Sequence, residues 1–250
     1  GAWGSGSPAF YRTLATGLGA FGFRVLLLSY RVYPEATMKE QADDLGQALT
    51  WLDENSALLD DITSQGVYII GHSSGAHITS LYKVRNTLAN QKTPANVLCY
   101  ILFNGVYDIG DHYEHEASRH VHEISPMKAA AGNPENFAHN SPALIANSLT
   151  QEQASSIVPT ILIHGEQDIV VPASSSILYA EAMRKAGAKV TLQCIPELDH
   201  GNGIWQLMFP DEFSIAHENE VSKILTSLND LSQQWAENKV IISESEQVRD

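Results

Sequence analysis

The alternation of short apolar runs with helical patterns constrains this chain most strongly. Five runs are rich in apolar residues and do not alternate between apolar and polar, which is typical of parallel strands covered on both faces. These runs are residues 23–30, 67–70, 97–103, 160–164 and 190–195. Because helical patterns lie between them, we predict an α/β fold with one mainly parallel sheet and helices on both faces.

Two helices have clear start or stop signals. Apolar residues recur at three- and four-residue steps from Met38 to Leu52, and Thr37 followed by Glu40 predicts a capping box at the start. Another helix is predicted to begin near Pro172 and to end at Gly187, since glycine tolerates the positive φ of a helix end.

Charge and composition exclude several classes of protein. The chain has 15 Lys and Arg against 29 Asp and Glu, and this net charge of −14 would repel nucleic acid and anionic membranes. No apolar run approaches the roughly 20 residues of a membrane-spanning helix, so we predict no transmembrane segment. Cys99 and Cys194 lie in strand-like runs and are interpreted as buried thiols.

Residues 108–150 interrupt the alternation. They contain no convincing strand, and we predict a lid or cap of loops and short helices inserted into a single domain over residues 1–236, with a polar tail at 237–250. Tyr107, Tyr113 and Phe137 either line a substrate pocket beneath this lid or pack against other side chains of the core. The following acidic and histidine residues are interpreted as polar surface rather than as a metal site, because zinc needs a closed, inward-facing ligand set: Asp108, Asp111, His112, His115, His120 and His122.

Residues 66–75 read G-V-Y-I-I-G-H-S-S-G and contain a G-x-S-x-G motif between a strand and a helix. A sharp turn there would hold Ser73 in a strained conformation and expose its hydroxyl. Gly71 and Gly75 fit this turn if side chains at their positions would collide with the backbone. We therefore predict that Ser73 is a nucleophile, with the helix N-terminus stabilising an oxyanion.

A serine nucleophile needs a base, which is oriented by an acid. His200 and Asp168 each follow an apolar run, and catalytic groups in such sheets gather where the strands end. The order Ser73, Asp168, His200 is the one this architecture requires. Glu166 and Asp199 are the competing acids. We interpret His164 as structural, and His72 and His77 as packing or hydrogen-bonding residues beside the turn.

Several motifs together resemble the α/β-hydrolases. The similarity is greatest to the branch of hormone-sensitive-lipase-like esterases, kynurenine formamidases and isoprenylcysteine methylesterases. The matching segments are G-A-W-G-S-G at 1–6, Y-R-V-Y-P-E-A at 30–36, G-H-S-S-G-A-H at 71–77, G-E-Q-D-I-V-V-P at 165–172 and D-H-G at 199–201.

This resemblance implies an oxyanion hole formed by the backbone N–H groups of Gly1, Ala2 and Ser74. It also implies that the family's first strands precede Gly1, so that the chain is expected to be a fragment. The expected activity is hydrolysis of a carboxylic ester of a small molecule, with no cofactor and no metal. Two alternatives are an arylformamidase that cleaves an amide and a hydrolase-like binding protein without turnover.

Overall fold

The computed structural model describes residues 1–20, 23–56 and 66–209, which fall into two compact units. Of the described residues, those within 1–8 and 28–203 form the first unit, and those within 9–27 and 204–209 belong to the second. In the second unit, helices α1 (Arg12–Ala20) and α9 (Asn202–Met208) approach closely. A Cβ added to Gly17 of α1 would lie 1.8 Å from the Leu207 carbonyl oxygen of α9, so only glycine fits there.

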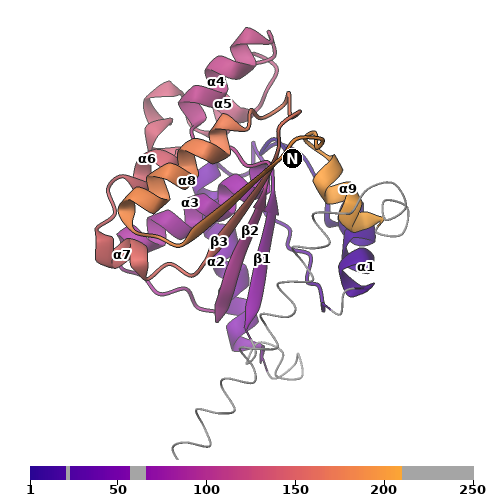
Figure 1. Ribbon diagram of the computed structural model, residues 1–250, viewed down its shortest axis with the longest axis vertical. Coiled ribbons are helices and arrows are strands. Elements are labelled where there is room, and N and C mark those ends of the chain that lie inside the picture. Colours follow the sequence, from indigo (N-terminus) through magenta and orange to yellow (C-terminus); the bar gives the residue numbers. More distant parts are fainter. Residues whose placement is uncertain (21–22, 57–65, 210–250) are drawn as a thin grey trace, which may run out of the picture. The chain divides into compact units, whose positions relative to one another are not determined.

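The first unit contains a parallel sheet of four strands in the order β1-β2-β3-β4 (Figure 1). The strands are β1 (Val67–His72), β2 (Val97–Phe103), β3 (Thr160–Gly165) and β4 (Val190–Ile195). They confirm four of the five predicted strands and the mainly parallel sheet. Because all four run in the same direction, the residues that follow them meet at one edge of the sheet.

The predicted strand at 23–30 is wrong. The structure assigns no strand to these residues, and β1 pairs only with β2 in the described part of the chain. A strand is stabilised by backbone hydrogen bonds to a neighbour, and no described strand offers them to this segment. The apolar pattern did not lead to burial either, since the Leu26 and Leu28 residues are 51% and 43% exposed.

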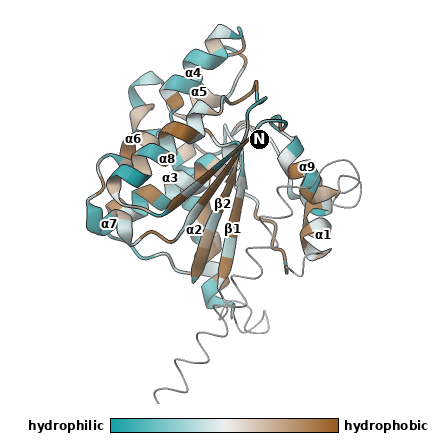
Figure 2. Ribbon diagram, in the orientation of Figure 1, coloured by the Kyte–Doolittle hydropathy of each residue, from teal (hydrophilic) through white to brown (hydrophobic). Residues whose placement is uncertain are grey.

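Helices pack on the sheet as the sequence predicts. Helix α3 (Ser74–Leu88) contacts β1, α8 (Ser174–Ala186) contacts β3 and β4, and α2 (Met38–Glu54) packs on α3. The capping box of α2 is present, with the Glu40 carboxylate accepting from the Thr37 N–H at 2.8 Å. Helix α8 ends at Gly187, whose φ is 112°. Figure 2 shows the strands mostly hydrophobic, whereas the helices alternate in hydropathy.

The inserted segment (residues 108–150) contains short helices and no strand, as predicted. It consists of α4 (Ile109–Ser118), α5 (Met127–Ala130), η4 (Pro134–Asn136), η5 (Ala138–Asn140) and α6 (Pro142–Ala146), and α7 (Gln151–Ser155) follows it. Of the two free thiols, Cys99 is buried and Cys194 is only partly buried. Within the described ranges, no helix combines the length and the apolar character needed to cross a bilayer.

Lys83 is a charged side chain buried in the layer between α3 and the sheet. Its ammonium donates to Thr160 Oγ1 at 2.8 Å and lies 4.9 Å from the centre of the Tyr100 ring. Lys83 is only 3% exposed, and this burial lowers its pKa to about 7. An unfolded lysine has a pKa of about 10.4, so the unfolded chain binds more protons between these two values. Lys83 therefore makes the free energy of unfolding increase as the pH rises from about 7 to about 10.4.

We expect Lys83→Met to raise the free energy of unfolding at pH 7 by on the order of 1–4 kcal/mol, because it removes a buried charge. Urea unfolding at pH 7 and pH 9 measures the effect. The advantage of the variant should shrink at pH 9, where the native lysine is neutral in the folded protein. The exposed Lys39 supplies the control, Lys39→Met, which should stay within about 0.5 kcal/mol of the native value. An advantage that grows with pH would contradict the prediction.

Candidate active site

Ser73 occupies a strained turn between β1 and α3. Its φ and ψ are 54° and −121°, which are unfavourable for any residue other than glycine. Its N–H donates to the Phe103 carbonyl at 2.9 Å, which fixes the turn to the end of β2. A Cβ at Gly71 would lie 2.8 Å from the Gly75 carbonyl oxygen, so the prediction for Gly71 is confirmed. An added Cβ at Gly75 would meet no atom within 4 Å outside its chain neighbours and its own helix, so the expected clash with the neighbouring backbone stays a prediction.

Ser73, His200 and Asp168 converge at the edge of the sheet where the strands end. His200 Nε2 lies 3.0 Å from Ser73 Oγ, and His200 Nδ1 lies 2.7 Å from Asp168 Oδ2. With the carboxylate ionised, Nδ1–H donates to Asp168 and Nε2 is left to accept the serine proton. The His200 side chain is 21% exposed, whereas that of Asp168 is fully buried.

The Asp168 carboxylate is surrounded by donors. Oδ1 accepts from the backbone N–H groups of Val170 and Val171, both at 2.8 Å, and Oδ2 accepts from Asn104 Nδ2 at 2.7 Å in addition to His200. Burial alone would raise the pKa of Asp168, but the nearby His164 and His200 rings and the Val171 N–H outweigh it and hold that pKa well below its ordinary value. The carboxylate is therefore charged at neutral pH.

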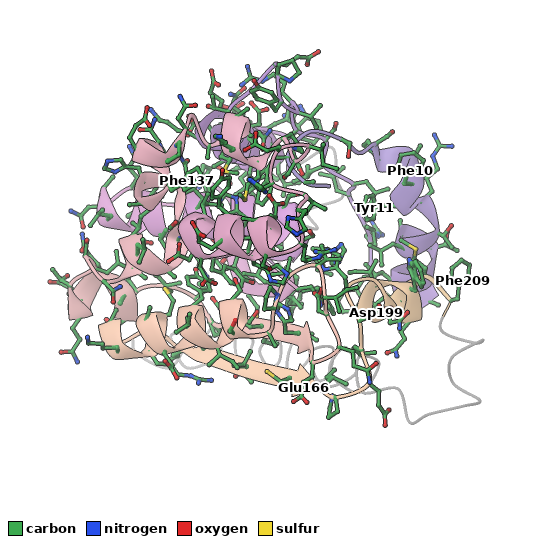
Figure 3. All side chains as sticks on the ribbon, turned by 90° about the horizontal axis from the view of Figure 1, so that it is seen from above. Phe10, Tyr11, Phe137, Glu166, Asp199 and Phe209 are labelled. Carbon is green, nitrogen blue, oxygen red and sulfur yellow. The ribbon has the colours of Figure 1, made fainter. Side chains whose placement is uncertain are left out.

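Asp199 and Glu166, the two competing acids, are not directed at the His200 ring. Asp199 Oδ1 accepts from the N–H groups of Gly201 and Asn202 at 2.9 and 2.8 Å, which closes the turn around His200. Glu166 is exposed and points away from the body of the protein (Figure 3). Neither carboxylate contacts the His200 ring.

Two histidines contact the Asp168–His200 pair. His72 Nε2 donates to the His200 carbonyl oxygen at 2.7 Å, and burial lowers the pKa of His72 to about 4. His164 is fully buried, with Nε2 donating to the Val171 carbonyl at 2.8 Å and lying 3.4 Å from Asp168 Oδ2. Both rings hold the surroundings of the pair in place, and neither reaches Ser73.

The residues expected to form the oxyanion hole are Gly1, Ala2 and Ser74. Of these, Gly1 lies close to Ser74. A Cβ built on Gly1 would lie 3.9 Å from Ser74 Oγ, so the first loop meets the start of α3. The N–H of Ser74 is among the first four of α3, which have no partner within the helix. The nitrogen of Gly1 donates to the Ser5 carbonyl at 2.7 Å.

Trp3 anchors this first loop. Its indole N–H donates to His77 Nδ1 at 2.9 Å, so the opposite nitrogen of His77 carries the proton and donates to the Asn140 carbonyl at 2.8 Å. Burial keeps His77 neutral by lowering its pKa to about 4. The Trp3 carbonyl accepts from Gln41 Nε2 and from the Tyr33 N–H, both at 2.8 Å. These bonds join the loop to α2, α3 and the inserted segment.

We expect His77→Phe to lower the free energy of unfolding by about 1–3 kcal/mol, because the Trp3 indole and the Asn140 carbonyl both lose a buried partner. In the double variant with Trp3→Phe the loss should be smaller than the sum of the two single losses, since both remove the same bond. Urea unfolding at pH 7 of the four proteins measures this coupling. Additive losses would contradict it.

The inserted segment is not merely a polar surface. His112 and Glu116 of α4 are 6% and 8% exposed, and the His112 ring lies 6.4 Å from the Trp3 ring. His112 and Glu116 are four residues apart in α4, so they lie on the same face of the helix, and this face points inward. His112 Nε2 lies 3.6 Å from Glu116 Oε1. The surface interpretation is therefore wrong for His112. Asp108 caps α4 by accepting from two N–H groups, and the described residues contain no group of three side chains suited to a metal ion.

The three aromatic residues beside the inserted segment pack against other side chains. Tyr107 is fully buried and stacks on Tyr179 with 4.2 Å between ring centres. Tyr113 lies 5.4 Å from Phe137, which Figure 3 places among the helices of this segment. Of the two interpretations left open, ordinary packing therefore applies to Tyr107.

Sequence reasoning missed Asn104, which follows β2 directly and is 2% exposed. Its amide nitrogen contacts Asp168 Oδ2 at 2.7 Å and the Asp199 carbonyl at 3.4 Å. The available signal was its position, since it ends a strand just as Ser73 and Asp168 follow theirs. An asparagine before glycine reads more simply as a turn.

Residues 1–203 match the model of a protein family described as having the alpha/beta hydrolase fold. Esterase B from Lactobacillus Rhamnosis (HN001) superposes with a TM-score of 0.72 and 18% identity over 96% of this chain and 76% of that chain. Carboxyl esterase 2 from Tuber melanosporum superposes with a TM-score of 0.71 and 16% identity, and the match covers 91% of this chain and 74% of that chain. At such identities the likeness establishes the fold.

Sequence relatives include a probable isoprenylcysteine alpha-carbonyl methylesterase from Oryza sativa subsp. japonica. It is 25% identical over 198 residues, which cover 77% of this chain and 47% of that protein. Kynurenine formamidase from Drosophila melanogaster is 22% identical over 207 residues, which cover 83% and 63%. The chain thus spans about half the length of the first relative.

Proposed function

Because this chain belongs to the α/β-hydrolase family, we propose that it is a serine hydrolase that cleaves a carboxylic ester of a small molecule through an acyl-enzyme. The observation that carries the proposal is the continuous chain of hydrogen bonds from Ser73 Oγ through the His200 ring to Asp168. Such a chain turns a weakly nucleophilic hydroxyl into an activated one.

In the acylation step, Ser73 Oγ attacks the ester carbonyl carbon and its proton passes to His200 Nε2. The carbonyl oxygen becomes an oxyanion, and the tetrahedral intermediate collapses as the leaving alkoxide takes that proton from His200. Asp168 remains ionised throughout and stabilises the positively charged imidazole. Water then attacks the acyl carbon and gives a proton to His200. The second tetrahedral intermediate collapses as Ser73 Oγ leaves and takes that proton from His200, which releases the carboxylic acid and restores the free serine.

The oxyanion is proposed to bind the N–H group of Ala2, in the first loop, and that of Ser74, at the start of α3. The dipole of α3 adds partial positive charge there. Gly1 precedes Ala2 in the same loop, next to Ser74, and is included in the proposed site. The inserted segment is proposed to cover the pocket, since it contacts Trp3 through α4 and the Ile169 carbonyl through His115.

An arylformamidase is the second candidate, because kynurenine formamidases are among the relatives. The same three side chains would then cleave a formamide, with an arylamine as the leaving group. Hydrolysis of short-chain p-nitrophenyl esters and of an N-formyl arylamine, measured on the same preparation, separates the two. An ester hydrolase should favour the esters in kcat/KM, and the reverse preference would establish the formamidase.

A fluorophosphonate probe tests the shared first step. The probe should attach to Ser73, as located by mass spectrometry of the labelled peptide, because only an activated serine reacts quickly. The exposed Ser155 offers a matched control, since Ser155→Ala should label as the native protein does. An absence of labelling together with an absence of turnover would favour a binding protein of hydrolase fold.

A further inference from the structure

Asn104 stands at the centre of the edge where the catalytic side chains meet. It directly follows β2, which lies in the sheet between β1, leading to Ser73, and β3, leading to Asp168. Its φ is 48°, a left-handed conformation that asparagine tolerates better than most residues. Its N–H donates to the Ile163 carbonyl of β3 at 2.9 Å. The backbone thus directs the side chain from a fixed point.

The Asn104 amide contacts both the acid and the segment that carries the base. Nδ2 donates to Asp168 Oδ2 at 2.7 Å, and it lies 3.4 Å from the carbonyl oxygen of Asp199, the residue before His200. Asp168 Oδ2 is the same oxygen that accepts from His200 Nδ1. One carboxylate oxygen is therefore shared by the amide and the imidazole.

We propose that Asn104 is a positioning residue for the hydrolysis, holding Asp168 and His200 in the geometry that lets the imidazole take the proton of Ser73. The proposal rests on the proposed function. Oδ1 is fixed by two backbone N–H groups, and without Asn104 the second oxygen would keep the His200 bond and a longer approach of 3.4 Å from His164. The carboxylate would then be free to tilt, and the His200 ring with it.

The effect should appear in kcat rather than in KM. Asn104 is 2% exposed, so it cannot contact substrate, and its loss leaves the binding surface unchanged. Asn104→Gly deletes the amide and accepts the positive φ without strain. Asn104→Asp keeps the shape but replaces the donor with a second carboxylate beside Asp168. Both should lower kcat about 10- to 100-fold, the usual range for a hydrogen bond to a charged group.

Asn147→Ala provides the control, because Asn147 lies at the exposed end of α6 and its side chain donates to the Ala143 carbonyl, within its own helix. It should retain the native kcat. If kcat in both Asn104 variants stays at the native value while the folded fraction is unchanged, the positioning role is overturned. An increase in KM equal to the loss of kcat/KM would also overturn it, since that pattern belongs to substrate binding.

A readout independent of turnover separates this proposal from the proposed function. The proton between His200 Nδ1 and Asp168 Oδ2, which are 2.7 Å apart, is expected to give a low-field proton NMR resonance that depends on the geometry of that bond. We expect Asn104→Gly to shift or broaden it, whereas a change in general packing such as Asn147→Ala should not. An unchanged resonance in both Asn104 variants overturns the inference even if the native enzyme hydrolyses esters. A native protein without turnover would instead overturn the function, while a shifted resonance would still support the positioning role.

Discussion

Ser73→Ala is expected to abolish ester hydrolysis, lowering kcat by about 10⁶-fold. The substitution removes the atom that bonds to the substrate, and among the residues that the structure describes no other hydroxyl is bonded to His200 Nε2. A p-nitrophenyl ester assay measures the loss, with the fluorophosphonate probe as a check that labelling disappears as well. Residual hydrolysis above the uncatalysed rate would come from the oxyanion site alone.

The loss should not reflect unfolding. Ser73 Oγ makes one hydrogen bond, to His200, and the backbone bond to the Phe103 carbonyl is kept by alanine. Serine and alanine both carry a Cβ, so the strain of φ 54° is the same in either residue. We therefore expect the free energy of unfolding to stay within about 1 kcal/mol. Native turnover in a correctly folded Ser73→Ala protein would remove this serine from the mechanism.

The sequence predicted those parts of the fold that depend on local patterns. The strands β2 and β4 begin and end where their apolar runs do, and the Thr37 and Glu40 capping box forms because both residues act within one turn of chain. The segment 23–30 has an equally apolar pattern and forms no strand. Strand formation needs a neighbouring backbone, and a pattern within one segment carries no information about its neighbours.

The candidate site was predictable to the extent that topology fixes it. Ser73, Asp168 and His200 were chosen because each follows a strand, and parallel strands end at one edge. Asn104 satisfies the same condition, but an amide does not titrate near neutral pH and so is not a candidate acid or base. The polar character of its segment predicts a surface position for His112, but α4 turns this residue inward, near the Trp3 ring. Such contacts depend on three-dimensional placement.

Asp168→Asn is expected to lower kcat by about 10⁴-fold. An amide in place of the carboxylate presents one oxygen and one NH₂ group to a site in which both oxygens accept hydrogen bonds. If the NH₂ group faces His200, Nδ1 must accept and the proton moves to Nε2, which can then no longer take the proton of Ser73. The exposed Asp53 gives the matched control, Asp53→Asn, which should retain the native kcat.

The other orientation of the amide is blocked by the backbone. An NH₂ group at the Oδ1 position would face the N–H groups of Val170 and Val171, which donate at 2.8 Å, and would leave both without an acceptor. In the first orientation, the NH₂ group would also face the amide nitrogen of Asn104, which donates to Asp168 Oδ2 in the native protein. Each orientation thus leaves a buried donor facing another donor. We expect the free energy of unfolding at pH 7 to fall by about 1–3 kcal/mol. The kinetic and the stability losses share this cause, the replacement of an acceptor by a donor.

The pH dependence of that stability loss tests the charge on Asp168. The pKa of Asp168 is held well below its ordinary value, so the folded protein keeps this carboxylate ionised at pH values where the unfolded chain binds a proton. Its contribution is present in full above the unfolded pKa of about 3.9 and is lost as the pH falls further. The difference in unfolding free energy between the native protein and Asp168→Asn should therefore be constant near neutral pH and shrink in acid. If the difference instead shrinks between pH 7 and 5, Asp168 is already protonated there, and it could not keep His200 in the tautomer that accepts the serine proton.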